Sequence, residues 1–204
     1  MRDGSDMTSL LTTLKRVATA LKAEEVPFAL SGSFAAYARG AAGSTHDVDF
    51  VVLPQDVERA LDVLTKAGLR PAEAVEDWLA KAYDGDNLVD LIHRPADEPI
   101  TTEMLDRATP LKVGSVLVPV LDATDLLVML LRSFTEHECD FAGPLAMARS
   151  LREQADWGRV FRESAHSPYA YAFLTLLLRL GVIEHEEGDE RVCSRAPVPG
   201  HPSA

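Results

Sequence analysis

The stretch SGSFAAYARGAAGSTHDVDF, residues 31–50, joins a Ser-Gly-Ser turn to two carboxylates, Asp47 and Asp49, that lie two residues apart. In a β-strand the side chains of residues i and i+2 point to the same face, so the two carboxylates are expected to project together. Two carboxylates this close repel each other unless a divalent cation lies between them. Mg²⁺, or Mn²⁺ in its place, suits such a pair because it binds carboxylates together with substrate phosphates and water. The pair therefore predicts a metal site.

A third carboxylate, Asp90, lies in the apolar stretch NLVDLIH, which is typical of a strand. If this strand pairs beside the strand of Asp47 and Asp49, Asp90 completes a cluster of three metal-binding carboxylates. We also expect Asp90 to take a proton from an incoming hydroxyl as a general base. A lone Asp in a strand can instead face solvent, and an Asp-x-Asp pair can cap a loop. The prediction therefore depends on the three residues occurring together.

The Ser-Gly-Ser turn at residues 31–33 supplies groups that suit a phosphate. Gly32 has no side chain, which lets the backbone approach a ligand closely. Ser33 lies at the start of an expected helix, where free N–H groups and the helix dipole favour an anion. Phosphate-binding groups on one side and a metal on the other predict a site for a nucleoside triphosphate, with the metal offsetting charge on the leaving pyrophosphate.

The elements that must position these groups follow from hydrophobic periodicity and turn residues. Strands are expected at 27–30 and 47–53, and hairpins at 78–93, turning at DGDN, and at 111–121. Helices are expected at 7–23, 33–40, 54–67, 122–138, 144–156 and 168–180. The pattern predicts an α/β (α+β) front part followed by a helical back part. We expect three segments: a catalytic core at 1–121, a helical part at 122–183, and a flexible tail at 184–204.

Composition restricts the class of protein. The net charge of −12 argues against a surface coated with basic residues for nucleic acid, although it leaves room for a local basic patch. No apolar run is long enough to span a membrane, and the N-terminus carries no apolar signal-peptide core, so a cytoplasmic location is expected. Cys139 and Cys193 lie far apart, which favours a reducing compartment and no disulfide partner.

These motifs resemble the polymerase-β-like nucleotidyltransferase superfamily. Its signature is a Gly-Ser or Gly-Gly turn between a strand and a helix, an Asp-x-Asp pair on the next strand, and a third Asp on a later strand. The matching residues are Gly32, Ser33, Asp47, Asp49 and Asp90, and the resemblance covers about residues 26–93. It implies a nucleotidyltransferase fold with a small mixed sheet flanked by helices. It also implies transfer of a nucleoside monophosphate from a nucleoside triphosphate to a hydroxyl.

The stretch STHDVDFVV is similar to a motif of AbiEii-type and MenT-type toxin nucleotidyltransferases. That likeness implies transfer of a nucleotide, with CTP or UTP favoured, to the 3′ end of tRNA, and a cognate antitoxin protein. Such relatives carry an Arg before the loop Thr, so we expect Thr45 and, in place of that Arg, Arg39 to contact the triphosphate. They also carry a Lys where this chain has the apolar residues 129–131. Arg149 and Arg152 are expected to contact the RNA backbone.

Three questions stay open at the level of the sequence. A phosphate or nucleotide attached to Ser33, Ser44 or Thr45 would repel the incoming triphosphate, which predicts a possible regulatory modification. A strongly acidic protein suits a cationic drug better than tRNA, so transfer to an aminoglycoside or lincosamide hydroxyl is an alternative, and an acidic rather than basic groove beside the carboxylates would favour it. The missing Lys is consistent with a third alternative, a catalytically degenerate binding module.

Overall fold

The computed structural model describes residues 3–42 and 47–184, and its centre is a seven-stranded mixed sheet. The strand order across the sheet is β3-β4-β5-β2-β1-β7-β6. The strands are β1 (Phe28–Leu30), β2 (Asp47–Val52), β3 (Arg70–Ala72), β4 (Leu79–Asp84), β5 (Asn87–Ile92), β6 (Thr109–Val113) and β7 (Val116–Val120). Both predicted hairpins are confirmed, because β4 pairs antiparallel with β5 and β6 with β7.

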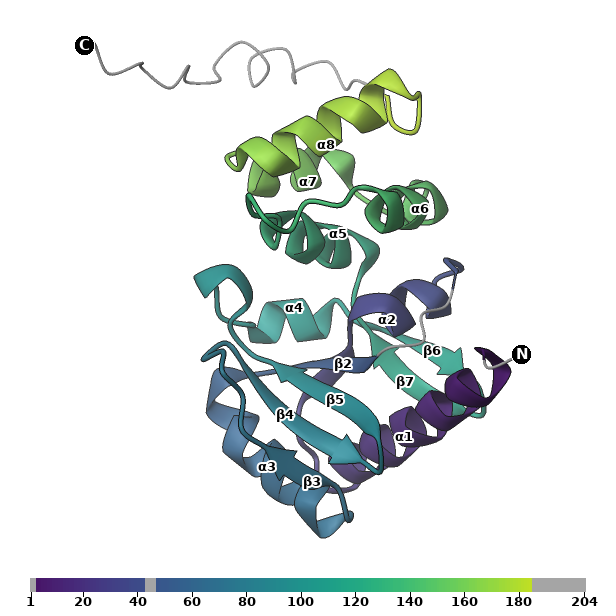
Figure 1. The fold of residues 1–204 in the computed structure, drawn as a ribbon, viewed down its shortest axis with the longest axis vertical. Coiled ribbons are helices and arrows are strands. Elements are labelled where there is room, and N and C mark those ends of the chain that lie inside the picture. The colour runs from purple at the N-terminus through teal and green to yellow at the C-terminus, as the bar shows by residue number, and fades with distance from the viewer. Residues whose placement is uncertain (1–2, 43–46, 185–204) are drawn as a thin grey trace, which may run out of the picture.

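The helices cover the sheet and then continue beyond it (Figure 1). Those within the sheet region are α1 (Asp3–Ala23), α2 (Gly32–Ala38), α3 (Val57–Lys66), preceded by the 3₁₀ turn η1 (Pro54–Asp56), and α4 (Thr102–Asp106), preceded by η2 (Pro95–Asp97). The helices that the structure describes after β7 stack above the sheet: α5 (Ala123–Arg132), α6 (Ala142–Leu151), α7 (Trp157–Ser164) and α8 (Pro168–Arg179). The mixed α/β fold with a helical C-terminal part is therefore as predicted.

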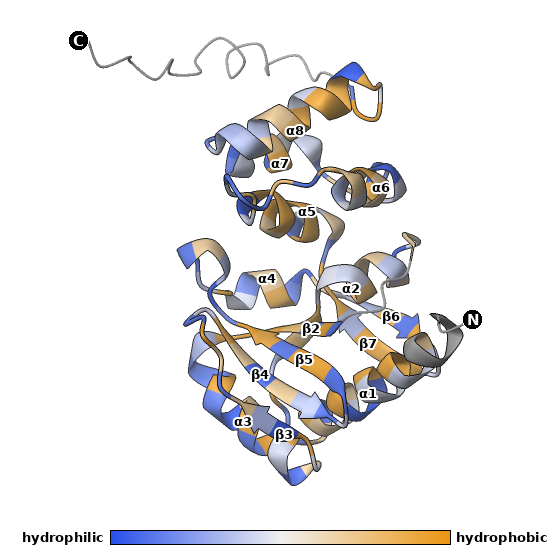
Figure 2. Cartoon of the chain, in the orientation of Figure 1, coloured by the Kyte–Doolittle hydropathy of each residue, from blue (hydrophilic) through white to orange (hydrophobic). Residues whose placement is uncertain are grey.

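The hydrophobic core follows the alternation along the strands and the apolar stripe of each helix (Figure 2). Val48 is fully buried on one face of β2, while Asp47 and Asp49 lie on the other face and are partly exposed. On α1, Leu14, Val17 and Leu21 are fully buried at helical spacing. Among the described residues no helix is both long and apolar enough to cross a membrane.

Several predicted boundaries were wrong, and a local cap explains the start of one helix that was missed. The helix expected at 122–138 ends at Arg132, and the one expected at 144–156 ends at Leu151. Helix α7 was not predicted; it begins because the Asp156 side chain accepts a hydrogen bond from the Arg159 N–H at 2.8 Å, a normal N-cap. The short elements β3 and α4 were also missed. Of the expected tail, residues 185–204 lie outside the described residues.

A buried carboxylate ties the helical part to the sheet region. Asp125 on α5 is 1% exposed and receives two hydrogen bonds of 2.9 Å from Arg107, at the end of α4. Arg159 on α7 donates a third, at 2.5 Å. An ionised carboxylate is stable in an apolar interior only when charged donors surround it in this way. Asp125 therefore joins three helices through one side chain.

We expect Asp125→Ala to lower the free energy of unfolding by about 3 kcal/mol, because three charge-assisted hydrogen bonds are lost. Urea denaturation followed by circular dichroism measures the change. Glu153→Ala is the control, since Glu153 pairs with Arg152 at an exposed site, and it should cost less than about 0.5 kcal/mol. Equal stabilities for the two variants would contradict the structural role of Asp125.

Candidate active site

Three carboxylates meet on one face of the sheet. Strands β2 and β5 pair in parallel, with Asp49 directly opposite Asp90, and Asp47 lies two residues before Asp49 on the same face. Asp47, Asp49 and Asp90 each offer an oxygen within 4.8 Å of the other two. The three carboxylates that the sequence expected to cluster are thus brought together. The parallel pairing is what places Asp90 beside a residue 41 positions earlier in the chain.

Crowding and burial make two of these carboxylates, Asp49 and Asp90, hard to ionise. Burial raises the pKa of Asp49 from 3.8 to about 7, and the nearby charges of Asp47 and Asp90 add to the effect. Burial also raises the pKa of Asp90 to about 6, although Lys81 acts in the opposite direction. Asp90 is 8% exposed, and its Oδ1 has no hydrogen-bond partner among the described residues. A divalent cation would supply the missing positive charge and the missing partner, so these residues fit one.

Gly32 is required because a carboxylate lies against it. The residue has φ = +58°, and a Cβ at this position would lie 1.9 Å from Asp49 Oδ2. The sequence suggested that the missing side chain makes room for a ligand; in the structure that room is taken by Asp49. The neighbouring Ser31 N–H donates to the Asp49 carbonyl at 2.9 Å, which fixes the turn beside β2. The absence of a side chain at Gly32 thus makes room for one carboxylate of the cluster.

Ser33 lies in the first turn of α2, and its Oγ is buried without a hydrogen-bond partner among the described residues. A buried hydroxyl without a partner is costly, so this one is available to a ligand. Its burial also limits access by a modifying enzyme. Of the other expected phosphate contacts and modification sites, Ser44 and Thr45 lie outside the described residues.

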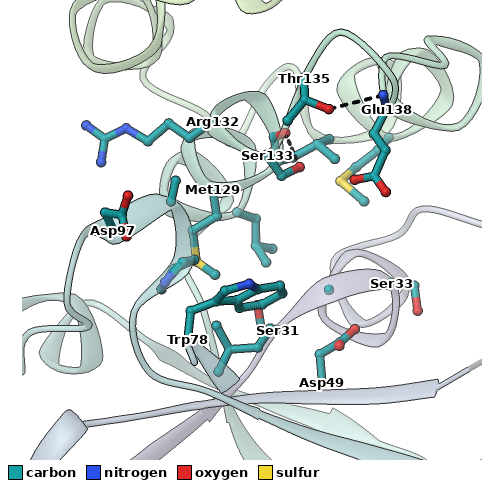
Figure 3. A pocket seen from close by; sticks show the side chains of 17 residues that line it. Ser31, Ser33, Asp49, Trp78, Asp97, Met129, Arg132, Ser133, Thr135 and Glu138 are labelled. Atoms are coloured by element: carbon teal, nitrogen blue, oxygen red, sulfur yellow. Dashed lines mark hydrogen bonds between the residues drawn. The ribbon is translucent and has the colours of Figure 1, made fainter. Parts of the chain in front are cut away.

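A cavity of about 560 Å³ opens from this turn and extends beneath α5 and α6 (Figure 3). A volume of that size suits a nucleotide or a drug-sized molecule. Figure 3 shows Asp49, Ser31 and Trp78 on one side of the cavity and Met129, Ser133 and Thr135 on the opposite side. The cavity is lined by Ser31, Gly32, Ser33, Asp49, Trp78, Ile92, Pro95, Ala96, Asp97, Leu126, Met129, Leu130, Arg132, Ser133, Thr135, Glu138 and Met147.

Arg39 does not reach this cavity. It follows the last residue of α2, at the opposite end of that helix from Gly32. Its guanidinium donates to the carbonyls of Leu121 at 2.6 Å and Val120 at 3.2 Å. These carbonyls lie at the end of β7, so the Arg39 side chain ties the end of α2 to the end of that strand. The triphosphate contact that the sequence suggested for Arg39 has no support in this arrangement.

Arg149 and Arg152 are both exposed and do not line the cavity. Met147 on α6 does line it, and Arg149 follows two residues later, about 200° around the helix, so it faces away. Arg152 follows the last residue of α6 and pairs with Glu153 at 2.9 Å. The structure does not bring these two cations to the carboxylates.

Lys81 and Trp78 are residues that the sequence reasoning missed. Lys81 on β4 lies directly opposite Asp90 on β5, and its Nζ is 3.1 Å from Glu76 Oε2. The signal was available, because a hairpin that turns at Gly85-Asp86 pairs Asp84 with Asn87 and, three positions back, Lys81 with Asp90. Trp78 precedes β4, and only the packing of α5 over the sheet shows that it lines a cavity.

A family model described as an uncharacterised nucleotidyltransferase matches residues 4–184. Among solved structures, ANT(2″)-Ia in complex with adenylyl-2″-tobramycin matches with a TM-score of 0.60 at 13% identity, over 82% of this chain and 98% of that chain. A solution structure of the antibiotic-resistance factor ANT(2″)-Ia gives 0.60 at 16% identity, over 86% and 99%. The lincomycin-bound lincosamide adenylyltransferase LnuA gives 0.47 at 12% identity, over 70% and 96%. No curated protein matches the chain.

The structural matches at a TM-score of 0.60 show a shared fold. The finer resemblance to AbiEii-type and MenT-type toxins is not confirmed by these comparisons. The fold itself was predicted correctly from the motif at residues 31–50 and from Asp90.

We expect Gly32→Ala to weaken Mn²⁺ or Mg²⁺ binding at least about tenfold and to destabilise the fold by about 2 to 4 kcal/mol, because the new Cβ displaces the Asp49 carboxylate and the backbone is left-handed. Gly40→Ala is the matched control: Gly40 also has a positive φ, +102°, but a Cβ there meets nothing within 4 Å. Calorimetric metal titration and urea denaturation measure both effects. Similar losses in the two variants would mean that backbone strain alone is responsible.

The raised pKa of Asp49 predicts a pH-dependent stability for the metal-free protein. The folded pKa, about 7, lies above the ordinary 3.8, so the folded state holds a proton that the unfolded chain releases between those values. Stability from this carboxyl is therefore complete below about pH 4 and is lost as the pH rises through about 7. We expect Asp49→Asn to be more stable than wild type at pH 8. The free energy of unfolding of the variant minus that of the wild type should be about 2 to 4 kcal/mol larger at pH 8 than at pH 5.

Added Mg²⁺ should raise the stability of the wild type at pH 8 and have little effect on Asp49→Asn, because a cation compensates only the ionised cluster. Thermal unfolding at the two pH values, with and without Mg²⁺, measures both differences. If the difference between wild type and variant is the same at both pH values, Asp49 does not have the raised pKa.

Proposed function

This chain belongs to the uncharacterised nucleotidyltransferase family, and we propose that it transfers a nucleoside monophosphate from a nucleoside triphosphate to a hydroxyl of a small cationic acceptor. Enzymes of this class use a nucleoside triphosphate and divalent metal ions. The observation that carries the proposal is the cluster of Asp47, Asp49 and Asp90 beside the Gly32–Ser33 turn. The intact cluster also argues against a degenerate binding module.

Each group has a defined task in the proposed reaction. Asp47, Asp49 and Asp90 would hold Mg²⁺ or Mn²⁺, which supplies charge to offset that of the phosphate oxygens. The first turn of α2, with the buried Ser33 hydroxyl, would bind the terminal phosphates. Asp90 would accept the proton of the acceptor hydroxyl as its oxygen bonds to the α-phosphorus and the bond from that phosphorus to pyrophosphate breaks.

The order of the strands indicates the side of the site from which the acceptor would approach. Lys81 on β4 lies opposite Asp90 on β5, Asp90 lies opposite Asp49 on β2, and Asp49 is hydrogen-bonded to Ser31 at the end of β1. In phosphoryl transfer the attacking and leaving oxygens lie roughly in line across the phosphorus. If pyrophosphate leaves over β1 and α2, the acceptor hydroxyl must approach from the opposite side, over β4.

The approach over β4 is acidic. Glu76 and Asp77 are exposed in the segment before β4, and the nearby Lys81 is already paired with Glu76. The cavity adds Asp49, Asp97 and Glu138, and its cationic lining residue, Arg132, is paired with Glu98. An acidic approach attracts cations and repels a phosphate backbone.

This charge pattern favours a small acceptor that carries ammonium groups over the 3′ end of tRNA. The net charge of −12 points the same way, as do the outward-facing Arg149 and Arg152. Tight RNA binding needs several cations that contact phosphates. The aminoglycoside-modifying alternative therefore has more support than the tRNA-modifying toxin with its antitoxin. This choice rests on the charges of this chain, since the distant structural matches show only the fold.

A labelling experiment tests the proposal. The purified protein, Mg²⁺ and each α-labelled nucleoside triphosphate are incubated with hydroxylated polyamines that include tobramycin, and separately with total tRNA. We expect label on a polyamine, none on tRNA, and a loss of at least about a thousandfold in Asp49→Ala, because the metal charge in the transition state is lost. Glu153→Ala, altered far from the carboxylates, should retain full activity.

Label on tRNA that is lost in Asp49→Ala would establish the RNA acceptor and overturn the small-acceptor proposal. Absence of both transfer and Mg²⁺-nucleotide binding would support the degenerate module instead.

A further inference from the structure

The part of the cavity beyond the carboxylates is apolar. Ile92 follows Asp90 by two residues on β5, so the two side chains lie on the same face. From Ile92 the wall continues through residues of the β4 start and of helices α5 and α6: Trp78, Leu126, Met129, Leu130 and Met147. A molecule whose phosphates lie at Ser33 and Asp49 would extend into this apolar region.

The hydroxyl and guanidinium groups over this wall already have partners, and the carboxylates of Asp97 and Glu138 lie elsewhere in the lining. The Ser133 hydroxyl donates to the Leu130 carbonyl at 2.8 Å, and the Thr135 hydroxyl accepts from the Glu138 N–H at 3.2 Å. Arg132 donates to the Glu163 carbonyl at 3.0 Å and also pairs with Glu98. Contact area rather than a pattern of hydrogen bonds is therefore what this region offers a ligand.

Trp78 provides a large share of that area and is held in place through its backbone. Its carbonyl accepts hydrogen bonds from the N–H groups of His93 at 3.0 Å and Arg94 at 3.1 Å, just beyond the end of β5. Figure 3 shows the indole on the same side of the cavity as Asp49 and across from Met129. With the backbone held, only the two side-chain torsions of the indole remain to be ordered when a second ring stacks on it, so little entropy is lost.

We propose that Trp78 is the platform on which the nucleobase stacks, and that the enzyme selects purine nucleoside triphosphates by ring area. The inference rests on the proposed function, because it places the nucleoside next to a triphosphate bound at Ser33 and Asp49. Stacking tolerates any base, and a purine presents more area than a pyrimidine. ATP and GTP bind with similar affinity, and both bind more tightly than CTP and UTP. This order is the reverse of the pyrimidine preference that the toxin resemblance implied.

Tryptophan fluorescence tests the inference directly, since the chain has two tryptophans. Trp157 is outside the cavity lining, and its indole N–H donates to the Arg152 carbonyl at 2.9 Å. Trp157→Phe therefore leaves Trp78 as the reporter. Titration with the Mg²⁺ complexes of ATP, GTP, CTP and UTP should quench the fluorescence, with purines saturating at concentrations about tenfold lower.

Calorimetry of Trp78→Leu should show ATP binding weakened by about tenfold, whereas Trp78→Phe, which keeps an aromatic ring, should retain most of the affinity. Mg²⁺-tripolyphosphate, which has no base, should bind wild type and Trp78→Leu equally and shows that the variant is folded. Trp157→Phe is the matched control and should bind ATP as the wild type does.

The outcomes separate this inference from the proposed function. If tripolyphosphate binds but Trp78→Leu leaves ATP binding unchanged, or if all four nucleotides bind equally, the stacking platform is wrong while the phosphate and metal site stands. A Trp78→Leu variant that alters only the concentration of acceptor needed for transfer would assign the ring to the acceptor and overturn the inference. If neither tripolyphosphate nor any nucleotide binds, both proposals are overturned.

Discussion

Repulsion among three carboxylates is the constraint around which this part of the molecule is organised. Asp47, Asp49 and Asp90 lie within 4.8 Å of one another, and burial raises the pKa of Asp49 and Asp90 toward neutrality. A fold accepts such a cluster only if the rest of the structure holds it rigidly. Here β2 and β5 pair in parallel through five residue pairs, and Gly32 leaves the space into which the Asp49 carboxylate fits. A bound cation would offset the electrostatic cost of this cluster.

Two further charged side chains, Asp125 and Arg39, hold the elements around the site together. Asp125 joins α4, α5 and α7 through Arg107 and Arg159. Helix α5, which lines the cavity, is therefore connected to the sheet region by charge-assisted hydrogen bonds. Arg39 closes the end of β7 by donating to two backbone carbonyls. Neither group touches the carboxylate cluster. Together they connect α2 to β7, and α5 to α4 and α7, and such connections favour a preorganised site.

Local patterns were enough to predict most of the fold, and long-range pairing explains most of what was missed. The strand of Asp47 and Asp49 and both hairpins follow from alternation and turn residues. The position of Asp90 was predicted only on the condition that its strand pairs beside β2, because strand order is not a local property. Strand β3 has three residues, one of them Pro71, and such a short, proline-containing segment carries little periodic signal. The hydrogen bonds of Arg39 could not be predicted, because the carbonyls that accept them belong to residues more than 80 positions away.

The three carboxylates and the charged residues around β4 lie on different strands, and this separation has an evolutionary consequence. Each of the three carboxylates comes from β2 or β5, whereas Lys81 lies on β4 and Glu76 in the segment that leads into it. Beyond β4 the sheet ends with the three-residue strand β3. Glu76 and Asp77, in the segment before β4, are exposed, so substitutions at these two positions leave the interior strands and their side chains in place. A lineage built on this scaffold would thus be free to change the charge that it presents to an acceptor by mutation at Glu76 or Asp77, while the carboxylates of β2 and β5 and the turn at Gly32 are inherited unchanged.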